Sequence, residues 1–155
     1  METFAFISNF QVSEVQLTYK RNYDITTRPA INCQVTAVEI FRQCWDDNII
    51  ELQEQFKVMY LSNSNAVLAI SEVSTGTCTS TVVDPRILFA TSLKLNAIGL
   101  IIAHNHPSGI LVPSQADIKM TTKLKEIALL LEIKLLDHFI FTKSNYYSFA
   151  DEGLL

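Results

Sequence analysis

Residues 98–109, with the sequence IGLIIAHNHPSG, decide the fold of this chain, because a continuous apolar run leads directly into two histidines and a proline. An apolar run without polar alternation is typical of a strand that is covered on both faces, as between layers of helices. A helical pattern begins shortly afterwards at Ser114. The sequence therefore predicts a buried strand whose end lies beside the start of a helix.

Outward from this stretch, helical and strand patterns alternate in the order expected for an α/β fold. The patterns predict helices over residues 35–45, 84–96 and from 114 onward, and strands over 54–61, 66–73, 98–103, 133–142 and 146–149. The first two strands flank Ser62-Asn63-Ser64-Asn65, which indicates a hairpin. We expect one α/β domain over residues 35–155, with a mixed sheet flanked by three helices. Residues 1–34 are predicted to form an arm with an early strand over 11–19.

The amino-acid composition is typical of a globular protein without a membrane span. The chain has 155 residues, of which 48% are hydrophobic and 18% charged, so one globular domain with a real core is expected. No apolar run approaches the roughly 18 residues of a membrane span, and the N-terminus lacks a secretory pattern, so a cytoplasmic protein is predicted. The three cysteines form no C-x-x-C pair and are predicted to be free thiols.

The charge balance gives no support to direct nucleic-acid binding. The formal net charge is −4, whereas domains that hold nucleic acid usually carry a concentrated basic patch. The densest basic group, Lys119, Lys123 and Lys125, shares its predicted helix with Glu126 and Glu132. Such a mixture indicates a solvated helix face.

The two histidines have the spacing of metal ligands. In an extended strand, residues two apart point to the same side, so His104 and His106 can converge on one ion. Asp117, in the first turn of the following helix, can supply a third ligand and leave a fourth position for water, as in catalytic zinc sites. Zinc is therefore predicted, although manganese or iron also suit nitrogen and oxygen ligands.

Each part of this pattern also has a structural interpretation. Ser114-x-x-Asp117 resembles a capping box, which satisfies free N–H groups at a helix start. Asn105 should point away from the ion and form a hydrogen bond that stabilises the loop. Asp137 and His138 could support the metal ligands or pair with each other near a strand start, and we favour the structural role.

Together, these residues resemble the JAMM, or JAB/MPN-plus, metalloprotein family. Its motif is an upstream glutamate, then H-x-H-P, six residues and S-x-x-D, and the spacing here matches in full. More narrowly, the motifs resemble the RadC-like branch of the family; they are Val83-Asp84-Pro85-Arg86, His104-Asn105-His106-Pro107-Ser108-Gly109, Pro113-Ser114-Gln115-Ala116-Asp117 and Leu136-Asp137-His138. The resemblance implies the JAB/MPN architecture, which is cytidine-deaminase-like.

Carried over by position, the resemblance implies that His104, His106 and Asp117 bind the metal. Glu54 best matches the upstream glutamate that acts as general base and acid, with Glu51 as the alternative. The resemblance also implies that Ser114 donates a hydrogen bond to the oxyanion of the reaction intermediate.

The implied activity is zinc-dependent hydrolysis of an amide or isopeptide bond in a peptide or protein substrate that the sequence does not identify. Two alternatives stay open, an accessory protein for DNA repair or mobile-element maintenance with a structural metal, and a metal-dependent nuclease. RadC-like proteins often carry a helix-hairpin-helix region, and residues 1–34 are too short and too β-like to supply one. The oligomeric state cannot be predicted from the sequence.

Overall fold

The computed structural model describes residues 27–155, which form one five-stranded sheet and three helices. The strand predicted over residues 11–19 lies outside the described residues. In chain order the elements are α1 (Gln34–Gln43), β1 (Gln55–Leu61), β2 (Val67–Thr75), α2 (Pro85–Leu95), β3 (Gly99–Asn105), α3 (Gln115–Leu130), β4 (Lys134–Phe141) and β5 (Tyr146–Ser148). The predicted α/β fold with three helices and a mixed sheet is confirmed.

The sheet has the strand order β2-β1-β3-β4-β5, which places β3 at its centre. The β1–β2, β1–β3 and β4–β5 pairs are antiparallel, and β3 pairs with β4 in parallel. The parallel pair requires a crossover connection, which α3 supplies. Every residue of β3 is buried, as expected for its apolar run.

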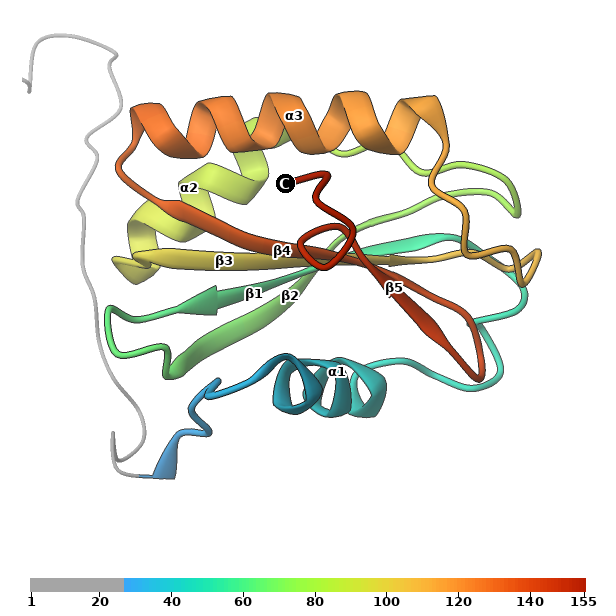
Figure 1. The fold of residues 1–155 in the computed structure, drawn as a ribbon, viewed down its shortest axis with the longest axis horizontal. Coiled ribbons are helices and arrows are strands. Elements are labelled where there is room, and N and C mark those ends of the chain that lie inside the picture. The colour runs from blue at the N-terminus through green and yellow to red at the C-terminus, as the bar shows by residue number, and fades with distance from the viewer. Residues whose placement is uncertain (1–26) are drawn as a thin grey trace, which may run out of the picture.

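Helices cover the two faces of the sheet, with α1 on one side and α2 and α3 on the other (Figure 1). The core on the α1 side includes Phe41 and Trp45 packed with Phe139 and Phe141. The core on the opposite side joins alternate residues of β1 and β3 to α2 and α3; it includes Phe56, Val58, Tyr60, Leu88, Leu100, Ile102, Leu124 and Ala128. The strands that lead to the site are therefore held from both sides.

Most differences from the predicted boundaries amount to one or two residues, but the end of β3 matters for the site. The predicted strand ended at residue 103, whereas β3 includes His104 and Asn105. His104 pairs with Phe56 of β1, and Asn105 pairs with Phe141 of β4. These neighbours extend the ladder past the last apolar residue, so the first histidine is held by a strand.

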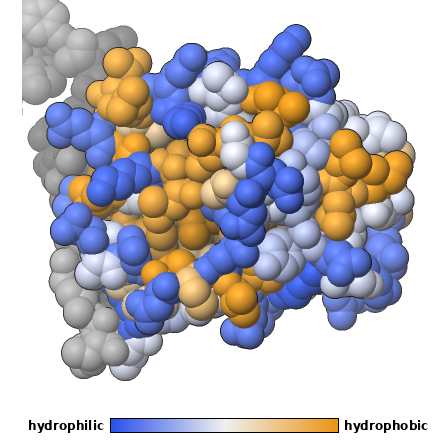
Figure 2. Space-filling model, viewed as in Figure 1, coloured by the Kyte–Doolittle hydropathy of each residue, from blue (hydrophilic) through white to orange (hydrophobic). Residues whose placement is uncertain are grey.

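The surface seen in Figure 2 mixes hydrophobic residues with hydrophilic ones that surround them. Exposed large apolar side chains of the described chain include Leu129 and Leu130 at the end of α3, and Val112 before its start. No helix within residues 27–155 is long and apolar enough to cross a membrane.

Candidate metal centre

The first two site residues lie at the end of the central strand. The His104 side chain is 1% exposed and that of His106 is 13% exposed. The backbone N–H of His106 still donates to the carbonyl of Phe141 at 2.8 Å, although β3 has ended at the previous residue. Pro107 follows and has no N–H with which the ladder could continue. The strand end therefore holds both imidazoles on an ordered backbone.

Asp117 is placed by the start of α3. Ser114 is the N-cap, and its hydroxyl oxygen accepts from the backbone N–H of Asp117 at 3.2 Å. In return, Asp117 Oδ2 accepts from the backbone N–H of Ser114 at 2.7 Å. The predicted capping box is confirmed, and it orients the carboxylate that faces the two histidines.

Glu54 immediately precedes β1, where its backbone pairs with the chain that follows β2. Its N–H donates to the carbonyl of Thr77 at 2.8 Å, and its carbonyl accepts from Gly76 at 2.8 Å. The alternative glutamate, Glu51, is 59% exposed and pairs with Lys143 at 2.9 Å. Of these two glutamates, Glu54 is therefore the one beside the histidines.

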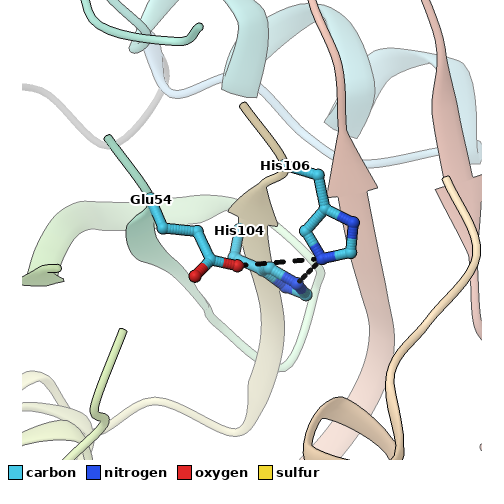
Figure 3. Close-up of side chains that lie close together, drawn as sticks. All are labelled: Glu54, His104 and His106. Atoms are coloured by element: carbon cyan, nitrogen blue, oxygen red, sulfur yellow. Dashed lines mark hydrogen bonds and ion pairs between the residues drawn. The ribbon is translucent and has the colours of Figure 1, made fainter. Parts of the chain in front are cut away.

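Glu54, next to the start of β1, points toward His104 and His106 at the end of β3 (Figure 3), and Asp117 of α3 faces the same two histidines. The Nε2 atoms of His104 and His106 lie 2.9 Å apart. Asp117 Oδ1 is 3.3 Å from His104 Nε2, and its Oδ2 is 3.7 Å from His106 Nε2. Glu54 Oε1 is 3.7 Å from His106 Nε2, and the possible ligand atoms of Glu54 and the two histidines all lie within 4.8 Å of one another. Both carboxylates thus face the same pair of nitrogens.

The tautomers of His104, His106 and His138 follow from the partners of the ring nitrogens that face away from the shared site. His106 Nδ1 lies 2.6 Å from the carbonyl of Ile110, which can only accept, so this nitrogen carries hydrogen. The hydroxyl of Thr121 donates to the Asp117 carbonyl at 2.6 Å, and it can therefore accept from His138 Nδ1 at 2.7 Å.

His138 Nε2 is then left without hydrogen and accepts from His104 Nδ1 at 2.8 Å. This series of bonds leaves the Nε2 lone pairs of both His104 and His106 directed at the shared site. The two Nε2 atoms lie 2.9 Å apart, so they can share a proton or face one metal ion.

The cluster shifts the pKa values of its members in different directions. Burial disfavours the charged form of Asp117, but hydrogen bonds that His104 and His106 donate when their Nε2 atoms are protonated, together with the bond from Ser114, outweigh it and hold the pKa well below its usual value. Burial lowers the pKa of His106, yet its bonds to Asp117 and to the Ile110 carbonyl raise it overall. Burial is the main cause that lowers the pKa of His138, which keeps this ring neutral.

Glu54 behaves differently from Asp117. Burial raises its pKa, and the Coulombic effect of the two histidines only partly opposes this rise. Its Oε2 atom is buried and makes no hydrogen bond within the described chain. Because a buried oxygen without a partner is costly, the residues present fit a site with a cation and a water near this atom.

A cavity of about 500 Å³ opens onto the cluster. Residues 78–83 form one wall, and the first two turns of α3 with Lys123 and Leu124 form the other. Gly76 lies where the first wall turns, and a Cβ there would come within 2.0 Å of the Ser80 carbonyl oxygen, so only glycine fits. A substrate in this cavity would reach His104, His106, Asp117, Glu54 and Ser114, all of which line it.

The backbone N–H of His138 donates to Asp137 Oδ1 at 2.7 Å, so the pairing that the sequence favoured is present. His138 also makes a second contact. It is fully buried and contacts the side chain of His104, while Asp137 has a separate role and accepts hydrogen bonds from Ser148 and the backbone of His138 and Ala150. Strand periodicity alone does not indicate this contact, because it depends on the register that pairs Ile102 with His138 and places His104 two residues further on the same face.

Taken together, the five-stranded mixed sheet, the three helices and the Glu-His-His cluster define an α/β domain of the JAB type with a possible metal site. The RadC-like JAB domain model matches residues 31–154, and the chain belongs to this family. The resemblance inferred from the motifs is thereby confirmed.

Relatives of known sequence carry the name UPF0758. One from Flavobacterium johnsoniae is 48% identical over 101 residues, which cover 65% of this chain and 44% of that protein. The UPF0758 protein YkfG of Escherichia coli is 44% identical over 103 residues, covering 66% of this chain and 65% of that protein. A UPF0758 protein of Histophilus somni is 46% identical over 101 residues and is covered over 46% of its length. The chain thus matches less than half the length of two of these three relatives.

Proposed function

We propose that this domain is a zinc-dependent hydrolase that cleaves an amide or isopeptide bond. The position of Glu54 carries the proposal. One of its carboxylate oxygens is buried without a hydrogen-bond partner in the described chain, and the other is 3.7 Å from His106 Nε2. A carboxylate held in this way is suited to take a proton from a water molecule in the cavity.

His104, His106 and Asp117 would hold the ion. A bound zinc ion would lower the pKa of water to about 7 and polarise the substrate carbonyl. Burial raises the pKa of Glu54 toward the working pH, which suits a group that first accepts a proton and then returns it to the leaving amine. The cap bond uses an oxygen lone pair of Ser114, so the hydroxyl hydrogen can donate to the carbonyl oxygen as that oxygen gains negative charge.

The cavity lining supports an amide substrate over a phosphodiester. Apart from the two histidines, Lys123 is the one basic residue that lines it within residues 27–155, and Glu54 and Asp117 add negative charge. A phosphodiester backbone would meet little compensating positive charge there. Val82, Val83 and Met120 also line the cavity and can pack against an apolar side chain next to the scissile bond.

The test combines elemental analysis of the purified full chain with a screen of peptide and isopeptide substrates. Glu54→Gln should retain the zinc content of the wild type and lose about a hundredfold or more in turnover. Glu51→Gln is the matched control, because it makes the same change in an exposed neighbouring glutamate, and it should behave as the wild type does.

Unchanged turnover by Glu54→Gln, or equal turnover by zinc-free protein, would refute the proposed function. An oligonucleotide arm at low salt, with His104→Ala as control, distinguishes the nuclease alternative. Cleavage there without cleavage of any peptide would replace the proposal.

A further inference from the structure

Asn105 lies between the two histidines of the centre, and its side chain is directed to the opposite face of the sheet. It is completely buried and makes four hydrogen bonds. Its Nδ2 donates to the carbonyls of Ile50 at 2.7 Å and Gln53 at 2.8 Å. Its Oδ1 accepts from the backbone N–H of Gln55 at 2.7 Å and from Trp45 Nε1 at 3.2 Å.

Two of these four bonds hold the peptide units on either side of Glu54. The carbonyl of Gln53 belongs to the residue before Glu54, and the N–H of Gln55 belongs to the residue after it. The regular pairing between β1 and β3 ends with Phe56 and His104, so the ladder does not reach these groups. The Asn105 side chain therefore continues the connection between the two strands beyond the end of the sheet.

Only an amide matches this set of partners. The carboxamide has two N–H donors and a carbonyl oxygen with two lone pairs, and all four are used here. A carboxylate would place an oxygen against the carbonyls of Ile50 and Gln53, and an apolar residue would leave several buried polar groups without partners. The environment is thus specific for asparagine.

We propose that Asn105 is a positioning residue, which holds the carboxylate of Glu54 at its working distance from the metal ligands. This inference rests on the proposed function of Glu54 as general base. His104 and His106 flank Asn105 in the chain. The same three-residue segment therefore carries both histidine ligands and, through the Asn105 side chain, holds the backbone on either side of Glu54. Because a misplacement of about 1 Å can cost a hundredfold in rate, such a clamp matters even though Asn105 does not touch the cavity.

The experiment compares wild-type full chain with Asn105→Ser, Asn105→Ala and Asn105→Asp. In each variant, kcat should fall by about a hundredfold with little change in KM or zinc content. Asn105→Asp should not restore the rate, because its carboxylate lacks both donors. Val38→Ala, which removes core volume beneath α1 without removing a hydrogen bond of Asn105, controls for lost stability and should retain the wild-type kcat.

Hydrogen exchange provides a readout that does not depend on activity. The backbone amide of Gln55 should exchange about tenfold faster in Asn105→Ser than in the wild type, while that of Met59 in the middle of β1 stays protected. If Asn105→Ala does not fold, Asn105→Ser carries the test alone. Unchanged exchange at Gln55, or unchanged kcat in a folded Asn105 variant, would overturn the inference.

A wild-type protein without hydrolase activity would refute the proposed function instead. In that case, Gln55 exchange would still decide whether Asn105 holds the segment around Glu54, so the two failures are distinguishable.

Discussion

His104 Nδ1 and His138 Nε2 lie 2.8 Å apart in the interior of the protein. The other ring nitrogen of His138 is hydrogen-bonded to the hydroxyl of Thr121. That hydroxyl donates to the backbone carbonyl of Asp117 in the first turn of α3. A third imidazole therefore determines which nitrogen of His104 is free to bind an ion, and it links the two protein segments that supply the predicted ligands.

Replacing His138 should weaken zinc binding without removing a ligand. In His138→Ala, His104 loses the partner that orients its ring, and we expect zinc affinity to fall by about 10- to 100-fold. Competition with a chromophoric chelator measures this. Phe139→Ala, which removes a neighbouring side chain of the opposite core, should cost stability and leave affinity unchanged. Equal zinc affinities in wild type and His138→Ala would contradict the orienting role.

Asp117→Asn separates the two roles of Asp117. The amide oxygen can still accept from the N–H of Ser114, so the stability of the metal-free protein should change by less than about 1 kcal/mol. Zinc affinity should drop sharply, since the negative charge beside His104 and His106 is lost. Urea denaturation without metal and chelator competition give the two values. A variant that binds zinc as tightly as the wild type would exclude Asp117 as a ligand.

Ser114 allows a similar separation. Ser114→Ala should lose about 0.5–2 kcal/mol of stability through loss of the N-cap, together with most of the turnover. Ser114→Asp restores a side chain that accepts from the helix N–H groups but has no hydroxyl hydrogen to donate. It should recover stability and not activity. Recovery of turnover in Ser114→Asp would show that capping alone is required.

Zinc should stabilise the folded chain. An ion that binds only the folded state adds about 2.7 kcal/mol to the free energy of unfolding at a free concentration of 100 times Kd. Urea denaturation with and without buffered zinc measures the difference. His106→Ala should abolish it, whereas Cys78→Ser, which alters another residue of the cavity wall, should retain it. Equal stabilisation of His106→Ala would place the ion elsewhere.

The ionisation of Glu72, which lies away from the metal centre, should make the free energy of unfolding depend on pH. Burial alone would raise its pKa, but hydrogen bonds from Lys57 and Thr75 outweigh burial and lower the pKa below the ordinary value of a glutamate. The stabilisation is therefore present above the unfolded-state pKa and is lost as the pH falls through the lower folded-state value.

The Glu72 carboxylate side chain is 41% exposed, so the effect should not exceed about 1 kcal/mol. Urea denaturation at pH 7 and pH 3 should show a smaller loss of stability in Glu72→Gln than in the wild type. Glu51→Gln, which also removes an ion pair, should keep the wild-type difference. An identical loss in Glu72→Gln would refute the assignment.

The sequence predicted those parts of the fold and site that depend on local spacing. The strand that carries the histidines could be predicted from the apolar run before His104. The capping box and the third candidate ligand could be predicted from the interval between Ser114 and Asp117. Neither prediction needs knowledge of distant contacts. The partner of His104 was missed because it depends on the register between β3 and β4, which shifts between Leu100 and Ile101. The sequence predicted that Asn105 points away from the ion and forms a stabilising hydrogen bond, but not its partners, since these lie about fifty residues away in the chain.

The pairing of Glu54 with Gly76 and Thr77 has a mechanical consequence. The same segment runs directly into the cavity wall at residues 78–83, and Gly76 keeps its turn tight against Ser80. An occupant that pushes this wall outward therefore pulls on the backbone that carries the glutamate. For the proposed hydrolase, a molecule that fits the cavity would leave the carboxylate in register with the histidines, while a poorly fitting one would displace it, so selection by shape would act on rate as well as on affinity.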